Sequence, residues 1–496
     1  DIRRVEKELE RELDRREKLM YAAVDPAAWA DAKLLKGKEK DLVGVERDML
    51  TIKRVIGSNE RFAELLRTEG VEPPMKISPA WMKRSKEERE DETDKYAYAF
   101  AKDDIKFTDL PNQVDEWGFD LNNPSDVALM VAKQERLQAL VDVRIAVKST
   151  TNVTRAQRFL TAGANGMSLP IGYAYYRAHT GRWGGQNKMN MQNLTRAYYD
   201  ANKQHIPGTG ELRLSILAPS GHRIAVQDSG QIECRVNGWL WGQHDLLDAF
   251  RASDTWDKSR GVARGDNRDA YCKFGDAIYG WEITTEDKTE RFVSKVGVLG
   301  LGFQMGPLKL QITLAKGALG GPPVYFGLDR CKAIVNTYRL KNHKIVAGWK
   351  ICERIIEDMA AGRAGNHGPL NWEANTIWLP NGMALKYPDL RKQIGDKGWD
   401  EWTYQAKDQR KKIYAGLCCE NIVQALARII VGWQMLQISR KYRVVMTTHD
   451  EVAALPKTAQ ADACVKYMAK WMSTPLPWCL DLPLSCEGGH DFNYSK

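Results

Sequence analysis

Two short β-like runs lie far apart in this chain of 496 residues and constrain its fold more than any other feature. The first is HRIAVQD, residues 222–228, and the second is YRVVMTTHDEVAAL, residues 442–455. Both alternate β-branched residues as half-buried strands do, and both reach an aspartate where the run ends or bends. Residues 236–435 between them read mainly as helix, with a loop expected near 361–398. The sequence therefore predicts a β-sheet platform assembled from two distant segments around a large helical insertion.

The first third of the chain is expected to be mostly helical and carries no obvious chemistry. Apolar residues recur at helical spacing among acids and bases in residues 1–20, which predicts an amphipathic helix with a solvated face. A second helical pattern runs from about residue 50 to residue 66. Two more are expected near 125–143 and 150–161.

Composition excludes several classes of protein. Hydrophobic residues make up 43% of the chain, too many for a disordered protein, and no run reaches the roughly 18 apolar residues of a membrane-spanning helix. The charged start DIRRVEKELE is no signal peptide. Nine cysteines without a C-x-x-C doublet favour small buried residues in a reducing compartment. We therefore expect a cytoplasmic protein that has no membrane partner. Its net charge of +9 makes the protein only mildly basic, which neither indicates nor excludes a polyanionic partner.

The acids at the ends of the β-like runs are the first candidates for chemistry. Asp228 closes the first run and is followed by Ser229, while Asp450 and Glu451 sit at the bend of the second. If the two runs are neighbours in one sheet, Asp228 and Asp450 converge. Two carboxylates plus a backbone carbonyl make a natural Mg²⁺ site that substrate phosphates complete. Taken alone, strand-end acids are more often ordinary turn residues.

The segment ERFVSKVGVLGLGFQMG, residues 290–306, is the second candidate. Arg291, Lys295, Leu299 and Phe303 recur every four residues, which predicts one stripe of about 18 Å along a helix. Such a stripe can lay two cations along a triphosphate and an aromatic ring beside the attached base. In isolation, an ordinary packed helix with snorkelling bases explains the same pattern.

The segment AHTGRWGGQNKMNMQNL, residues 178–194, is the third candidate. It offers Arg182 in a glycine-bounded turn, followed by Gln192 and Asn193. Long donors of this kind can contact minor-groove acceptors, which carry little base information and suit sequence-independent binding. Taken alone, this segment is typical of a polar loop. Gln424, in the segment ENIVQALARII, is by itself an ordinary polar residue on a protein surface.

In their order along the chain, these segments resemble family A DNA polymerases, the relatives of bacterial DNA polymerase I. The order is HTGRW–MQNL, then DSGQIECR, then R-x-x-x-K-x-x-x-x-x-x-x-F, then ENIVQA, then THDEV. The resemblance covers about residues 160–496, and FAELLRTEGVEPPMKIS, residues 62–78, is similar to the phage branch. It implies an α+β right-hand polymerase fold with a β-sheet palm, helical fingers and a helical thumb.

The resemblance also implies a division into domains. Residues 21–165 would form the thumb, residues 166–240 and 430–496 the two parts of the palm, and residues 241–429 the fingers. Residues 1–20 would be a remnant of an exonuclease domain or a linker helix. We expect these residues to lack most or all of that exonuclease domain.

By the same resemblance, Asp228 and Asp450 are the catalytic metal ligands, assisted by the Ser229 carbonyl, and Glu451 lies beside them in a supporting role. The cofactor is Mg²⁺, as two ions, which Mn²⁺ can replace.

For the incoming dNTP, the resemblance assigns Arg291 and Lys295 to the triphosphate and Phe303 to the hinge of the helix that closes over the nascent pair. Glu233 matches the acidic gate that crowds the sugar 2′ position and excludes NTPs. Tyr271 takes the place of a phosphate-contacting histidine and could donate one hydrogen bond.

For DNA, the resemblance assigns Arg182 and Gln424 to the minor groove at the primer end. His449 would contact the terminal primer phosphate, and Gln192 and Asn193 would contact the template.

The function implied is a template-directed DNA polymerase that adds dNMP to a primer 3′-hydroxyl and releases pyrophosphate, in phage replication within the host cytoplasm. Its partners are primer–template DNA and dNTPs; an accessory processivity factor stays an open question. One alternative is a single-subunit RNA polymerase, which Glu233 disfavours. The other is a primer–template binding protein with a decayed site, which the intact Asp228, Asp450, Arg291 and Lys295 disfavour.

Overall fold

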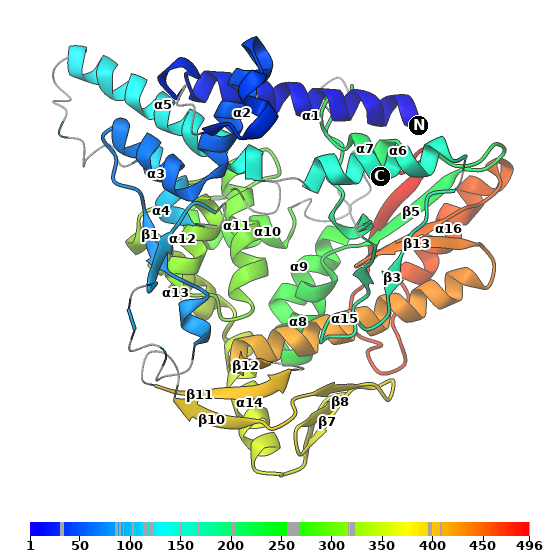
Figure 1. Cartoon of the computed structure of the whole chain (residues 1–496). Helices are drawn as coiled ribbons and strands as arrows, with labels where there is room; N and C mark the ends of the chain where they lie inside the picture. The colour runs from blue at the N-terminus through cyan, green and yellow to red at the C-terminus, as the bar shows by residue number, and fades with distance from the viewer. Residues whose placement is uncertain are drawn as a thin grey trace. The chain divides into compact units, whose positions relative to one another are not determined.

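The structure is a computed structural model whose chain divides into two compact units (Figure 1). Unit 1 comprises residues 1–169 and 206–212, and unit 2 comprises residues 170–205 and 213–496. The structure describes residues 1–29, 34–84, 88, 91–92, 94–101, 104–112, 118, 124–148, 151–166, 168–187, 189–199, 204–254, 268–315, 317, 323–394, 399–406 and 409–495.

Unit 1 is mostly helical, as the sequence predicts. Its helices are α1 (Ile2–Ala23), α2 (Gly44–Gly57), α3 (Asn59–Thr68), α4 (Ile105–Thr108), α5 (Pro124–Lys148) and α6 (Thr151–Ala164), and β1 (Met75–Ile77) pairs with β2 (Tyr96–Tyr98). One hydrophobic core joins helices α1 to α5, with Phe62, Phe100 and Phe107 in edge-to-face and tilted contacts.

Two boundaries in unit 1 differ from the expectation. The single helix expected over 50–66 is two helices, because the Ser58 side chain accepts a hydrogen bond from Arg61 N and begins α3 as its N-cap. Helix α1 continues past residue 20 to Ala23 and packs on α5 and α6.

Unit 2 contains the sheet that the two distant runs predict. Its strands are β5 (Ile224–Ser229), β13 (Val444–Thr448), β14 (Glu451–Ala454) and β15 (Cys486–Asp491), in the antiparallel order β13-β14-β5-β15. Helices α15 (Ala415–Ser439) and α16 (Ala461–Met472) cover one face, where Ala225, Val452 and Ala454 pack against Ile438 and Met468. The prediction of one sheet built from both runs is confirmed.

Helices form most of the insertion between β5 and β13, as expected. They are α8 (Ile232–Trp241), α9 (His244–Asp254), α10 (Ala270–Tyr279), α11 (Lys288–Leu301), α12 (Pro307–Ala315), α13 (Leu328–Lys341) and α14 (His343–Ala360), which share a core with part of α15. The short elements β3 (Tyr173–Ala174), β4 (Gly184–Gly185) and α7 (Glu211–Leu214) precede β5.

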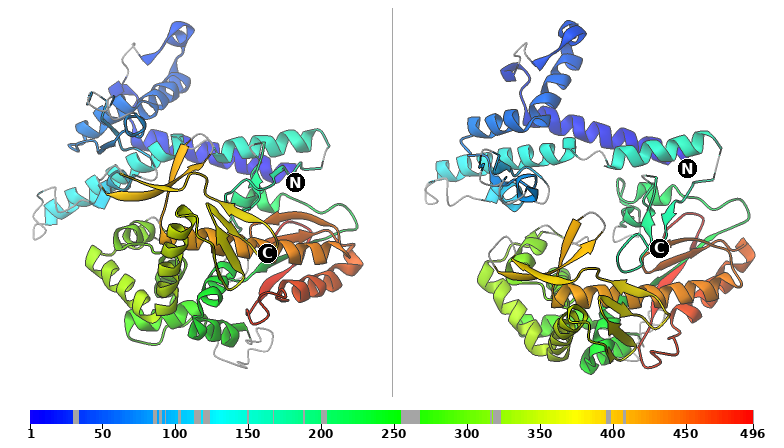
Figure 2. Two further views of the ribbon diagram at one scale, coloured as in Figure 1. Left: turned by 90° about the horizontal axis from the view of Figure 1, so that it is seen from below. Right: turned by 60° about the horizontal axis from the view of Figure 1, so that its bottom comes forward.

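The expectation of a loop near 361–398 is wrong. The described residues between 365 and 413 form two small antiparallel sheets. One holds β6 (Gly365–His367), β7 (Leu370–Glu373), β8 (Thr376–Trp378) and β9 (Ala384–Lys386); the other holds β10 (Arg391–Ile394), β11 (Asp400–Ala406) and β12 (Gln409–Ile413). Alternating burial along β7, with Leu370 and Trp372 inside, is the pattern of a half-buried strand. These strands lie beside α15 (Figures 1 and 2), where Asn421 Nδ2 donates to Tyr387 Oη at 3.1 Å.

Helix α15 is also the only helix in the described part of the chain that is long and apolar enough to cross a membrane. Of the most apolar stretch of this helix, 67% is buried inside the protein, which is typical of a core helix. The nine cysteines carry no disulfide, and eight of them are buried, as the sequence predicts.

Candidate active site

The ends of β5 and β14 bring the predicted acids together. Ser229 N donates a hydrogen bond to Asp450 O at 2.9 Å, and Asp228 lies directly opposite Glu451 in the register. Directly opposed residues point to the same face of an antiparallel pair. Because Ala225 and Val452 point to helices α15 and α16, Asp228 and Glu451 lie on the opposite face.

The Glu451 carboxylate is held in a buried network. Arg213 Nη2 donates to both carboxylate oxygens at 2.9 and 2.7 Å, and the Tyr494 hydroxyl donates to Oε1. The Arg213 guanidinium carbon lies 3.9 Å from the centre of the Tyr494 ring. Burial and the Glu451 charge raise the pKa of Tyr494. Glu451 is therefore fixed by protein groups beside Asp228, which fits a supporting role.

Removing Arg213 is expected to destabilise unit 2 strongly. The Arg213 and Glu451 side chains are only 6% and 4% exposed, so Arg213→Met leaves a buried carboxylate without its cation. Breaking one partner of a buried pair typically costs about 3–5 kcal/mol. Urea denaturation should show this loss, whereas Arg251→Met, which removes an exposed pair with Asp248, should change stability by less than about 1 kcal/mol. Equal stabilities of the two variants would contradict the role given to Arg213.

Two further charged residues flank Asp228. Arg196 Nη2 lies 3.2 Å from Asp228 Oδ2, and Glu487 on β15 stands opposite Asp228 in the register. The Arg196 side chain is 57% exposed, so this is a surface ion pair that another cation can displace.

Arg182 and Glu233, which the sequence assigns to separate roles, form an ion pair in the structure. Arg182 lies in the loop between β3 and β4, directly after Gly181, whose φ of +77° places it in the left-handed region. Glu233 stands in the first turn of α8, which follows directly on the strand that carries Asp228. Burial lowers the pKa of Arg182, and the nearby Asp450 carboxylate opposes that shift.

Gln424 on α15 lies beside the same loop. Its Oε1 accepts a hydrogen bond from the Thr180 hydroxyl at 3.4 Å, and its Nε2 donates to Glu420 at 3.0 Å. His449 occupies the turn between β13 and β14 with a φ of +57°, and desolvation and the Arg182 charge lower its pKa. The structure therefore gathers Arg182, Gln424 and His449 around the acidic strand ends.

Gln192 and Asn193 form the short 3₁₀ turn Met191–Asn193, beyond the β3–β4 hairpin. Gln192 Nε2 donates to Trp183 O at 2.9 Å, which ties this turn to the residue after Arg182. A template contact by these residues stays a prediction.

The predicted stripe on α11 is confirmed for its helical part. Arg291, Lys295 and Leu299 are half-buried, whereas residues 292–294 and 296–298 between them are buried, so the stripe is the open face of this helix. Helix α11 ends at Leu301, and Phe303 lies in the turn that follows. The expectation that Phe303 continues the helix is wrong, because Phe303 N and Gln304 N bond to carbonyls only three residues back, and Gln304 then takes a φ of +66°.

The two cations on α11 differ in their surroundings. Arg291 Nε donates to Asp269 Oδ2 at 3.0 Å, and Asp269 also caps the start of α10. Burial, then Arg291 and Arg196, lower the pKa of Lys295. Arg196 is thus near both Lys295 and Asp228, which links the α11 stripe to the acidic strand end.

Tyr271 on α10 is 4% exposed in the core beneath Arg291, whose guanidinium carbon lies 5.6 Å from the ring centre. Burial raises the pKa of its hydroxyl. A phosphate contact by Tyr271 therefore requires a movement of α10 or α11 that opens this core.

The donor set at the strand ends fits Mg²⁺. No group of three or more His, Cys, Asp or Glu among the described residues is arranged to hold a metal ion. Mg²⁺, however, is commonly held by one or two carboxylates while water and substrate phosphates complete its shell. Asp228, Asp450 and the Ser229 carbonyl supply hard oxygen ligands of this kind.

Four residues that hold the site were missed in the sequence: Arg196, Arg213, Asp269 and Tyr494. Each acts through a contact between segments distant in sequence, such as Arg213 with Glu451, 238 residues apart. Only Asp269 had a local signal, as an N-cap before the helical pattern of DAYCKF.

The sheet with its two aspartates, the helical insertion and the basic helix α11 are the parts expected of a right-hand polymerase fold. In agreement, the chain matches the solved polymerase domain of Pol1 from M. smegmatis in complex with DNA primer-template and dNTP. The TM-score is 0.57 with 13% identity, over 100% of this chain and 66% of that chain.

Within this class the chain is similar to the DNA polymerase of Bacillus phage SP02, with 25% identity over 362 residues. The match covers 65% of this chain and 52% of that polymerase, so the chain spans about half the length of this curated relative. No protein-family model matches the chain. Both comparisons agree with the resemblance to DNA polymerases that the sequence shows.

Proposed function

We propose that this chain is a template-directed DNA polymerase that extends a primer 3′-hydroxyl with dNTPs by two-metal-ion phosphoryl transfer, in phage DNA replication within the host cytoplasm. The observation that carries the proposal is the joining of β5 and β14. The hydrogen bond from Ser229 N to Asp450 O brings Asp228 and Asp450 together although 222 residues separate them.

The residues of this chain would bind and orient the two substrates. Arg291 and Lys295 would hold the triphosphate along the open face of α11, with charge-assisted contacts to its oxygens. Arg182, Gln424 and His449 would hold the primer terminus beside the acids. The primer hydroxyl then attacks the α-phosphate in line and pyrophosphate leaves, so catalysis is positioning plus electrostatics.

Asp228, Asp450 and the Ser229 carbonyl would hold the Mg²⁺ ions. When bound, these ions activate the attacking hydroxyl and stabilise the leaving oxygen. Glu451, fixed by Arg213 and Tyr494, would lie beside this centre in a supporting role without serving as a ligand.

Primer extension with dNTPs and NTPs in parallel tests the proposal. Extension with dNTPs alone supports the polymerase and the Glu233 gate together. Extension with NTPs would favour the RNA polymerase alternative, and tight primer–template binding without any extension would favour the binding protein.

The pH dependence of dNTP use should report Lys295. Its pKa lies below 10.5, so this lysine loses its proton, and its hold on the triphosphate, at a lower pH than an exposed lysine does. The KM for dNTP is therefore expected to rise with increasing pH, and to do so at a lower pH than the ordinary pKa of a lysine. The Lys295→Arg variant keeps its positive charge at high pH. Its KM for dNTP, divided by the KM of the same variant at pH 7.5, should therefore not change with pH. Parallel pH profiles of the two proteins would contradict this assignment.

A further inference from the structure

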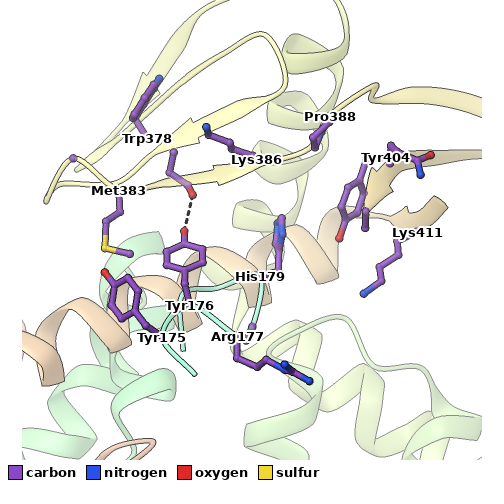
Figure 3. Close-up of a pocket in the computed structure, with 15 residues that line it drawn as sticks. Tyr175, Tyr176, Arg177, His179, Trp378, Met383, Lys386, Pro388, Tyr404 and Lys411 are labelled. Atoms are coloured by element: carbon purple, nitrogen blue, oxygen red, sulfur yellow. Dashed lines mark hydrogen bonds between the residues drawn. The ribbon is translucent and has the colours of Figure 1, made fainter. Parts of the chain in front are cut away.

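A cavity of about 1030 Å³ lies in unit 2, outside the proposed catalytic residues (Figure 3). Residues 175–179 form one wall, the β8–β9 hairpin a second, and strands β11 and β12 a third. The second and third walls belong to the two small sheets of residues 365–413. None of the catalytic assignments uses these sheets.

Exposed aromatic rings line this cavity. Tyr175 is 62% exposed and Trp378 is 39% exposed, although both belong to folded elements. Their surroundings are fixed: Tyr176 Oη donates to Ala384 O at 2.8 Å, as Figure 3 shows, and Trp378 Nε1 donates to Glu373 at 2.8 Å. Exposed rings on a fixed frame provide stacking surfaces for planar groups.

The charged groups of the cavity are positive. Arg177, Lys386 and Lys411 line it from its three walls, and all three side chains are exposed. None of the described lining residues is acidic. The ligand that this combination fits is planar and anionic, and single-stranded nucleic acid has both properties.

The cavity adjoins the residues proposed to hold the primer terminus. Residues 175–179 lead directly into the loop that carries Arg182. Arg428, one helical turn after Gln424 on α15, donates to Gly181 O at 3.0 Å, and its guanidinium carbon lies 5.5 Å from the centre of the Tyr175 ring. The template strand paired with a primer held at this site can therefore continue into the cavity.

We propose that this cavity binds unpaired nucleotides of the template strand, with bases stacked on Tyr175 and Trp378 and phosphates near Arg177, Lys386 and Lys411. The inference rests on the proposed polymerase function. While the primer 3′-end occupies the acidic strand ends, the strand of a primed template that stays unpaired there is the template ahead of the primer.

The test is equilibrium binding, by fluorescence anisotropy, of primer–templates with 5′ template overhangs of one to eight nucleotides. The native chain should bind overhangs of four or more nucleotides about tenfold more tightly than an overhang of one. Tyr175→Ala and Trp378→Ala should each lose most of this gain while binding the one-nucleotide overhang as the native chain does. Trp281→Ala is the matched control, because Trp281 is 48% exposed and lies outside the cavity.

Two supporting measurements keep the test independent of folding defects. Lys386→Gln and Lys411→Gln leave the rings intact and should lower the salt dependence of overhang binding. 2-Aminopurine in the overhang should be quenched at particular template positions by the native chain and not by Trp378→Ala.

The inference would be overturned if the native chain bound all overhang lengths with the same affinity. It would also be overturned if both aromatic variants kept the full increase in affinity for long overhangs. A defect seen only with mismatched primers would place the frayed primer end in the cavity and overturn it too. Failure of the polymerase proposal looks different, since the native chain would then extend no primer at any overhang length.

Discussion

Asp228→Asn is expected to abolish nucleotide addition while leaving primer–template affinity within about threefold of the native value. Asp228 stands at the end of β5, beside Asp450 and opposite Glu451. The amide removes one negative ligand from the proposed Mg²⁺ site, and metal ligation supplies several kcal/mol of transition-state stabilisation. We expect a loss of about 10³-fold or more in single-turnover rate. Quench-flow measurements with saturating DNA give this rate directly.

Glu487→Gln is the matched control for this prediction. Glu487 occupies the same row of the sheet on the other side of Asp228 but is not assigned as a ligand. Its neutralisation should reduce the rate by less than about tenfold. A fast Asp228→Asn variant would show that the metal ligands have been misassigned.

Glu233→Ala is expected to relax the selection of dNTPs over NTPs by roughly 10²-fold. The Glu233 carboxylate stands in the first turn of α8, directly after the strand of Asp228, and pairs with Arg182. An acidic side chain against the sugar 2′ position excludes a hydroxyl by crowding, and alanine removes that obstacle. The ratio of kcat/KM for dNTP and NTP on one template measures the effect.

Glu233→Ala also removes the ion-pair partner of Arg182. A second variant must therefore distinguish the loss of the ion pair from the loss of the carboxylate that excludes NTPs. Arg182→Ala breaks the same ion pair and leaves the carboxylate in place. It should weaken primer use without changing the dNTP/NTP ratio by more than a few fold. If both variants relax selection equally, the ion pair rather than the carboxylate sets sugar choice.

The sequence predicts the acidic centre well because its signals are local. Each β-like run shows its alternation and its terminal aspartate within a few residues, and the stripe of Arg291 and Lys295 follows from helical periodicity alone. The sequence also predicts that the two runs share one sheet, and the register of β5 with β14 confirms it.

The features that the sequence does not predict depend on short strands or on contacts between distant segments. Residues 365–413 carry many polar and turn-forming residues, and their strands are mostly three to five residues long, so their alternation is too brief to distinguish from a loop. The ion pairs of Arg213 with Glu451 and of Arg196 with Asp228 depend on tertiary contacts, which periodicity does not encode. Phe303 follows the helical spacing of its neighbours, but the helix ends two residues earlier.

The most direct test of the central claim is a single nucleotide addition by the native chain with one dNTP, a primed template and Mg²⁺. The account predicts a primer longer by one complementary nucleotide, one pyrophosphate released per addition, and neither product when EDTA replaces Mg²⁺. No elongated primer despite saturated DNA binding would contradict it, and so would elongation that is independent of the template base.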